Sequence, residues 1–266
     1  MLRLSRTNLV LAPAGSSGGA CRRRLASAAM RHPTVYLHGF GQKIPRDCRV
    51  LAALRSALPQ GADPQVLLPS FHPKGAGGKG DVQRTELEPF LNNLFHSIVS
   101  RKMQVHLVGY SVGGWLAAVF AERHPELVAS ALLLAPAIDN YERNFRNVPA
   151  EDWYMPPAYV AELQGLPPRP RIDTRLVPTV VLHGRDDTDQ GGSAPWRVEE
   201  WTAEEWASSS SSAEQRRCAV HMPLGVDHSL EPWLSGTGDG TVGGAPPLSA
   251  LLAGLHAPAA AAPAAL

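Results

Sequence analysis

A serine, an aspartate and a histidine of this chain occur in sequence contexts that suit nucleophilic attack on a carbonyl carbon. Ser111 lies in the segment GYSVGGW, residues 109–115, which contains the pattern G-x-S-x-G. This pattern is typical of a sharp turn from a strand into a helix, and residues without side chains, Gly109 and Gly113, avoid a clash there. The turn would expose the Ser111 hydroxyl, which could then form an acyl-enzyme intermediate.

The loop HGFGQ, residues 38–42, follows the first apolar run and could stabilise the negative charge that develops on the attacked oxygen. Backbone N–H groups aimed at that charge typically contribute about 2.7–4 kcal/mol each. We expect one donor to be the N–H of Val112, the residue after the nucleophile. The second donor is expected from Phe40, with Gly41 as the alternative.

Two further residues of this loop are expected to support it without reacting. Gly39 has no side chain, so the backbone there can approach a substrate closely. His38 resembles a catalytic base by residue type, but a histidine at this place more often braces the loop through hydrogen bonds.

The segment GRDDTD, residues 184–189, follows another apolar run and offers three aspartates as the acid that orients a histidine. An acid at the end of such a strand accepts the imidazole N–H and stabilises the imidazolium. The spacing Gly184-x-x-Asp187 favours Asp187. Asp186 is the second candidate, and Asp189 lies further into the loop.

A histidine late in the chain is expected to act as the base. His228 lies in PLGVDHSL, residues 223–230, after the last apolar run, and a loop at that place can reach across the sheet to Ser111. The spacing Gly225-x-x-His228 gives this loop its turn. His221 is the only near competitor, but it falls within the strand pattern and is less free to reach the serine.

The elements that must position these residues alternate between strands and helices. Short apolar and β-branched runs predict strands, and longer segments with apolar residues at helical spacing predict helices. The expected strands are residues 34–37, 65–68, 104–108, 128–134, 179–183 and 219–222. The expected helices are residues 46–58, 82–99, 113–124 and 248–256.

This alternation predicts an α/β fold with a mainly parallel central sheet and helices on both faces. In such sheets the chemistry lies beyond the carboxyl ends of the strands. Ser111, Asp187 and His228 each come shortly after an expected strand. The pattern therefore predicts that the three side chains meet at one edge of the sheet.

The ordered set of motifs resembles the α/β-hydrolase superfamily over about residues 33–234. The motifs that carry the resemblance are HGF (38–40), GYSVGG (109–114), Gly184-x-x-Asp187 and His228. Within the superfamily the chain is similar to the small YqiA-like esterases, because YLHGF begins close to the domain edge and APA (135–137) follows the next strand. The resemblance implies a minimal α/β-hydrolase fold that lacks the first two strands, with a small lid and a Ser111–His228–Asp187 triad.

The segment between the strand after the elbow helix and the acid strand, residues 139–177, is where this fold inserts its lid. It contains Trp153, Tyr154 and Met155, which could line an acyl pocket together with Tyr110. A short packing segment is the alternative interpretation. A lid of roughly 40 residues would suit short-chain esters or thioesters.

Other parts of the chain are expected to lie outside the catalytic core. Residues 1–30 hold five arginines, four serines and no acid, a composition typical of a chloroplast or mitochondrial transit peptide. A disordered basic tail on a cytoplasmic protein is the alternative. The hydrolase domain is expected over residues 31–256, with flexible inserts at 207–213 and 235–247 and a disordered Ala/Pro tail at 257–266.

Composition excludes several other classes of protein. The 266 residues include 25 lysines and arginines and 24 aspartates and glutamates, so the formal net charge is +1, unlike that of a strongly basic nucleic-acid binder. No run of about 18 apolar residues predicts a membrane span. The three cysteines form no metal-binding pair, and the glycines of residues 75–78 lack the context of a dinucleotide fingerprint, so no metal or cofactor is expected.

These observations predict a serine hydrolase that acts on a small-molecule carboxylic ester or thioester. A non-catalytic ligand-binding or signalling protein with the same fold is the alternative from another class. The same set of serine, histidine and aspartate would also support cleavage of peptide or carbon–carbon bonds.

Overall fold

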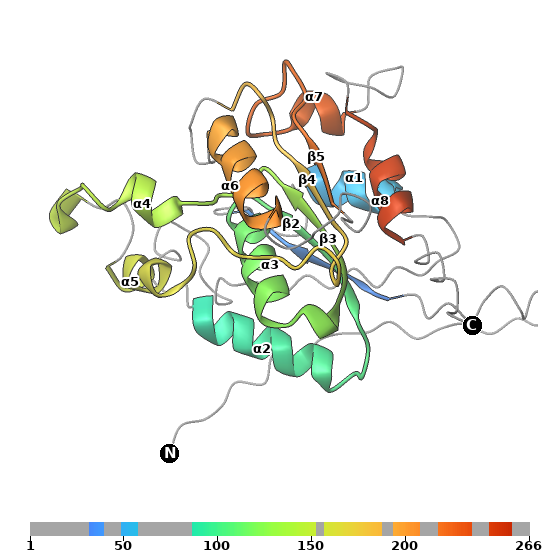
Figure 1. The fold of residues 1–266 in the computed structure, drawn as a ribbon, viewed down its shortest axis with the longest axis horizontal. Helices are drawn as coiled ribbons and strands as arrows, with labels where there is room; N and C mark the ends of the chain where they lie inside the picture. Colours follow the sequence, from blue (N-terminus) through green and yellow to red (C-terminus); the bar gives the residue numbers. More distant parts are fainter. Residues whose placement is uncertain are drawn as a thin grey trace, which may run out of the picture. The chain divides into compact units, whose positions relative to one another are not determined.

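Five parallel strands form a sheet in which the strands lie side by side in chain order (Figure 1). They are β1 (Thr34–Leu37), β2 (Val105–Tyr110), β3 (Val128–Leu134), β4 (Thr179–Leu182) and β5 (Cys218–His221). The register pairs Leu37 with Gly109, Tyr110 with Leu134, and Leu182 with His221. The carboxyl ends of neighbouring strands therefore lie at one edge of the sheet, and the loops that follow them are neighbours in space.

The structure is a computed structural model that describes residues 32–39, 49–57, 87–152, 157–187, 194–207, 218–235 and 245–256. All of these residues belong to the unit Arg31–Leu266. The expected strand at 65–68, the expected transit peptide at 1–30 and the expected tail at 257–266 lie outside the described residues.

Helices cover both faces of the sheet. The α-helices are α1 (Arg49–Ala57), α2 (Leu87–Val99), α3 (Val112–Arg123), α4 (Asn140–Asn144), α5 (Pro157–Gly165), α6 (Pro195–Ala207), α7 (Glu231–Leu234) and α8 (Leu248–His256). Two short 3₁₀ helices, η2 (Pro125–Leu127) and η3 (Ala150–Asp152), lie in the connections. The predicted α/β class with a parallel sheet between two helical layers is confirmed.

The two layers follow from the alternation of side chains along each strand. Leu107 and Leu133 face the layer that contains α2, α3, α5 and α6. Val108 and Leu132, their neighbours in sequence, face the layer that contains α1, α7 and α8. The crossovers from β2 to β5 each move one strand in the same direction, so right-handed connections place α3, α5 and α6 on one face (Figure 1).

Helix α3 is the most deeply buried of the helices. Every residue from Val112 to Ala121 is buried, because α3 packs against β1, β2 and β3 and belongs to the same apolar core as α2. A helix that is apolar all round is expected to be buried in this way.

Two differences from the sequence prediction bear on the site. Strand β2 ends at Tyr110, whereas the apolar run predicted an end at Val108. Helix α6, which was not predicted, follows the acid segment and carries the sequence PWRVEEWTAEEWA. Val198 and Trp201 of this helix are fully buried, whereas Trp196 is exposed.

The first turn of α3 passes very close to the end of β1. A Cβ atom added to Gly113 would meet the backbone carbonyl oxygens of Leu37 and His38. Both oxygens belong to the backbone, so neither can move aside without a shift of the main chain. The glycine therefore allows the close approach of helix and strand.

We expect Gly113→Ala to lower the free energy of unfolding by about 1–3 kcal/mol, since the added methyl group overpacks a rigid contact. Gly165→Ala is the matched control, because a Cβ atom at Gly165 meets nothing within 4 Å. That control should change stability by less than about 1 kcal/mol, in the stabilising direction. Urea unfolding measures both, and equal effects of the two substitutions would contradict the close approach at Gly113.

Candidate active site

Ser111 occupies a strained turn between β2 and α3. Its backbone angles are φ 55° and ψ −123°, a combination that residues with side chains rarely adopt. The Ser111 N–H donates to the Leu134 carbonyl oxygen at 2.9 Å, and the Ser111 carbonyl accepts the Ala137 N–H at 3.1 Å. These hydrogen bonds to β3 and to the loop after it hold the turn in place.

Small residues make this turn possible. A Cβ atom at Gly109 would lie 2.6 Å from the Gly114 Cα and would also clash with the Gly113 backbone. The two glycines of the G-x-S-x-G pattern therefore have different partners: Gly109 faces the start of α3, and Gly113 faces the end of β1.

The structure brings Ser111, His228 and Asp187 together, although the serine and the histidine are 117 positions apart in the chain. His228 Nε2 lies 3.0 Å from Ser111 Oγ, and His228 Nδ1 lies 2.8 Å from Asp187 Oδ2. An ionised carboxylate only accepts hydrogen bonds, so His228 Nδ1 carries the proton and Nε2 accepts from the serine hydroxyl. This arrangement can draw the hydroxyl proton away from Ser111.

Burial separates the two leading aspartates. Asp187 is 2% exposed and contacts His228, whereas Asp186 is exposed and its N–H donates to the Val226 carbonyl oxygen. Asp189 lies outside the described residues. Only Asp187, of the two aspartates that the structure describes in this segment, therefore has its carboxylate directed at a histidine.

The carboxylate of Asp187 is held in its charged form. Burial raises the pKa of Asp187, but polar contacts and electrostatic interactions with His183 and His228 more than offset it. The pKa of Asp187 consequently lies well below its ordinary value. The group stays ionised at neutral pH and can stabilise a positive charge on His228.

His183, which the sequence predicts only as the end of a strand, is a neighbour of Asp187. Its Nε2 lies 3.3 Å from Asp187 Oδ2, and its side chain is fully buried. The histidine comes directly after β4, and its N–H donates to the His221 carbonyl oxygen at 2.9 Å. The signal that could have identified it is its position four residues before Asp187 at the end of a buried strand.

The loops that carry the acid and the histidine are joined by backbone hydrogen bonds. The Arg185 N–H donates to the Pro223 carbonyl oxygen, and the Asp186 N–H donates to that of Val226, both at 3.0 Å. Gly184 lies against the Val226 backbone, where a side chain would clash. The two loops therefore form one layer above β4 and β5.

His221, the other histidine that the sequence offered as a base, lies within β5, where burial lowers its pKa.

Tyr110 supports the histidine loop from below. Its hydroxyl donates to the His228 carbonyl oxygen at 2.9 Å, and its ring centroid lies 5.5 Å from that of His228. The sequence predicts Tyr110 as a residue of a possible substrate pocket. The structure places most of this side chain in the core beside α1 and α8, because β2 continues through Gly109 and Tyr110.

The expected oxyanion loop is described only at its start. His38 is buried, and its Nδ1–H donates to the Gly39 carbonyl oxygen at 2.8 Å, which agrees with a bracing role. Gly39 lies against the Tyr110 ring and close to Ser111. Val112 is the first residue of α3, where a backbone N–H has no acceptor within its own helix. Phe40 lies outside the described residues.

Comparisons with known proteins complete the description of the fold. No protein-family model and no curated protein sequence matches this chain. Among solved structures, Est1E from Butyrivibrio proteoclasticus with ferulic acid bound is 15% identical, with a TM-score of 0.53, over 77% of this chain and 86% of Est1E. TT1662 from Thermus thermophilus is 18% identical, with a TM-score of 0.52, over 86% of this chain and 90% of TT1662.

The strained serine turn at the end of a central parallel strand, together with these similarities, decides the fold. This chain has the α/β-hydrolase fold. The narrower likeness to the YqiA-like esterases stays a prediction.

In this α/β-hydrolase fold, the segment between β3 and β4 contains α4, η3 and α5. Trp153, Tyr154 and Met155, the expected pocket residues, lie outside the described part of the segment. The side of α5 that contains Tyr159 and Leu163 is buried in the same layer as α2 and α3. At least this part of the expected lid packs against the body of the domain.

The start of this segment is hydrogen-bonded to a position near its end. The Asp139 N–H donates to the Pro168 carbonyl oxygen at 3.0 Å. Trp115 Nε1–H donates to the Pro167 carbonyl oxygen, and Trp201 Nε1–H donates to that of Pro170, both at 2.9 Å. Because Trp115 belongs to α3 and Trp201 to α6, the neck of the segment is attached to two core helices.

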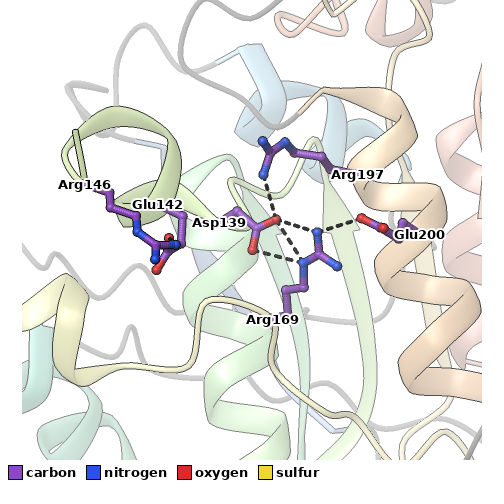
Figure 2. Close-up of polar contacts among 6 residues, drawn as sticks. All are labelled: Asp139, Glu142, Arg146, Arg169, Arg197 and Glu200. Atoms are coloured by element: carbon purple, nitrogen blue, oxygen red, sulfur yellow. Dashed lines mark hydrogen bonds and ion pairs between the residues drawn. The ribbon is translucent and has the colours of Figure 1, made fainter. Parts of the chain in front are cut away.

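A group of charged side chains reinforces this neck (Figure 2). Arg169 Nε lies 3.0 and 2.9 Å from the two carboxylate oxygens of Asp139, and Arg197 Nη1 lies 3.2 Å from Asp139 Oδ2. Glu200 accepts a hydrogen bond from Arg169 Nη2 at 2.8 Å. The hydrogen bond to Asp139 and the one to Glu200 raise the pKa of Arg169 against the effect of burial. Two arginines and two carboxylates thus balance their charges beside α6.

Two further findings concern the described part of the chain only. No group of three or more His, Cys, Asp or Glu side chains there is arranged to hold a metal ion. None of the helices there has the length and apolar character that crossing a membrane requires.

We expect Asp139→Asn to lower the free energy of unfolding by about 1–3 kcal/mol, because Arg169 and Arg197 lose their shared negative partner. Glu142→Gln is the matched control, since it removes one charge from the exposed Glu142–Arg146 pair in Figure 2. That pair should contribute only about 0.3–0.5 kcal/mol. Thermal unfolding followed by circular dichroism compares the variants, and equal destabilisation would refute a special role of Asp139.

Proposed function

We propose that this protein is a serine hydrolase that cleaves a carboxylic ester or thioester through an acyl-enzyme intermediate. The observation that carries the proposal is the position of the His228 imidazole, which lies within hydrogen-bond distance of Ser111 Oγ and Asp187 Oδ2 at once. Such an arrangement activates a serine hydroxyl, which is otherwise a weak nucleophile. The strained turn at Ser111 and the α/β-hydrolase fold support the same chemistry.

In the acylation step, Ser111 Oγ attacks the carbonyl carbon of the substrate while His228 Nε2 takes the hydroxyl proton. The negative charge moves to the former carbonyl oxygen. When the tetrahedral intermediate collapses, the bond from carbon to the ester oxygen or thioester sulfur breaks. The leaving group takes the proton from His228, and the acyl group stays on Ser111.

In the deacylation step, water replaces the alcohol or thiol. Its oxygen attacks the acyl carbon, and His228 Nε2 takes its proton. The bond between Ser111 Oγ and the acyl carbon then breaks, Ser111 regains a proton from His228, and the carboxylic acid is released. Asp187 stays ionised throughout and stabilises the imidazolium in both steps.

The oxyanion is proposed to bind the N–H groups of Val112 and Phe40. The support for Val112 is its place as the first residue of α3, directly after Ser111. The support for Phe40 comes from the sequence pattern and from Gly39, its neighbour, which lies close to Ser111. Two backbone donors in a dry site would typically contribute about 2.7–4 kcal/mol each to the stability of the transition state.

The proposed substrate class is an ester or thioester of a small carboxylic acid. Est1E, which shares the fold, binds ferulic acid, and a carboxylic acid is the product that hydrolysis of such a bond releases. A series of p-nitrophenyl esters and acyl thioesters of increasing chain length would define the acyl group.

We expect purified protein to react covalently with a fluorophosphonate probe at Ser111, because the probe captures activated serines. Ser111→Ala should abolish labelling and lower kcat on p-nitrophenyl esters by on the order of 10⁶-fold, since members of a triad act as a unit. Mass spectrometry of the labelled peptide identifies the site. Folded wild-type protein that stays unlabelled would overturn the proposal, and tight ligand binding without hydrolysis would favour a non-catalytic binding protein.

The assignment of the acid has its own test. We expect Asp187→Asn to lower kcat by about 10⁴-fold, because an asparagine no longer holds His228 in the required tautomer. Asp186→Asn is the matched control, since its side chain is exposed one position away, and it should leave kcat close to the wild-type value. Initial rates on one p-nitrophenyl ester compare the two, and similar rates in both variants would refute Asp187 as the acid.

A further inference from the structure

The imidazole of His183 is buried beside the proposed acid without a hydrogen bond of its own. The residue is 0% exposed. Within the described residues, neither of its ring nitrogens has a hydrogen-bond partner. The nearest charged atom that the structure gives it is Asp187 Oδ2, 3.3 Å from Nε2. The same oxygen accepts the His228 Nδ1–H at 2.8 Å.

Packing alone does not explain a histidine at this position. A buried polar group that lacks a hydrogen bond costs about 1–3 kcal/mol, and an apolar side chain of similar size would avoid that cost. His183 is also fixed in space, because its backbone N–H extends the hydrogen-bond ladder from β4 to the His221 carbonyl oxygen. An imidazole in this place is therefore a rigid polar group with its Nε2 3.3 Å from one carboxylate oxygen.

The charge on Asp187 selects the tautomer of His183. A lone pair on Nε2 would face the negative carboxylate and repel it, whereas an N–H at the same position is attracted. Of the two tautomers, the one with the proton on Nε2 is therefore favoured. Asp187 Oδ2 then faces two N–H groups, one from His183 and one from His228.

We infer that His183 is a positioning residue, which presents its Nε2–H to Asp187 Oδ2 and thereby holds the carboxylate in the orientation that accepts the His228 Nδ1–H. The inference rests on the proposed role of Asp187 in the hydrolase. His183 does not reach the substrate, since it is fully buried behind the carboxylate. Its contact also helps to keep the pKa of Asp187 below the ordinary value.

Loss of this contact should affect the chemical step more than substrate binding. Without the Nε2–H, the carboxylate can rotate away from His228, and the imidazole then loses its alignment with Ser111. A misplacement of about 1 Å can cost about 100-fold in rate. His183→Leu should therefore lower kcat by about tenfold to a hundredfold, with KM close to the wild-type value.

Two amide substitutions separate positioning from packing. The side-chain nitrogen of glutamine can take the place of imidazole Nε2, whereas that of asparagine takes the place of Nδ1 and falls short of Asp187. His183→Gln should therefore recover most of kcat, and His183→Asn should be as slow as His183→Leu. The two amides are similarly polar, so their comparison remains decisive if His183→Leu does not fold. His221→Leu, which removes a histidine side chain from the neighbouring strand, should leave kcat unchanged.

The experiment measures kcat and KM on a p-nitrophenyl ester, together with the proton NMR resonance of His228 Nδ1–H without substrate. Equal kcat in His183→Asn and His183→Gln, with this resonance at its wild-type position in both, would overturn the inference. If the wild-type protein hydrolyses no ester, the proposed function fails, and the resonance alone decides the inference. A shift in His183→Asn that is absent in His183→Gln would then uphold the contact, and no shift would reject it.

Discussion

A single buried negative charge organises the candidate active site. Burying a carboxylate is costly unless charged or polar partners surround it, and Asp187 satisfies this requirement with two histidines on one oxygen. One of these histidines, His183, is fixed by the sheet, and the other, His228, lies on a loop. The charge therefore ties a loop to the sheet, and the direction of the His228 ring toward Ser111 follows from that connection.

The parallel sheet places the loops that carry Ser111, Asp187 and His228 next to one another. Its hydrogen-bond pattern continues past the strand ends, from Ser111 to Leu134, from Ala135 to Leu182 and from His183 to His221. Each step fixes the start of a loop relative to its neighbour. Residues from distant parts of the sequence then lie within about 3 Å of one another.

The sequence predicted the parts of this arrangement that depend on local pattern. Ser111, Asp187 and His228 follow strands and stand beside glycines, and these signals are local. Other features depend on contacts between distant residues. The role of His183 depends on which face of the strand end it occupies, and the burial of Tyr110 follows from β2 running two residues further than its apolar run. Pairs such as Asp139 with Arg197 join residues 58 positions apart and leave no local signal.

The fastened neck between Asp139 and Pro168 has a consequence for how such a domain can diversify. Asp139 and Pro168, which bound most of the segment, are joined by a backbone hydrogen bond of 3.0 Å, so the chain between them forms a closed loop. The entropic cost of closing a loop rises slowly, by about 0.6 kcal/mol for each doubling of its length. Segments of very different length could therefore replace this one without a change in the sheet or in the neck. Such a replacement would give the domain a new surface and leave the serine turn as it is.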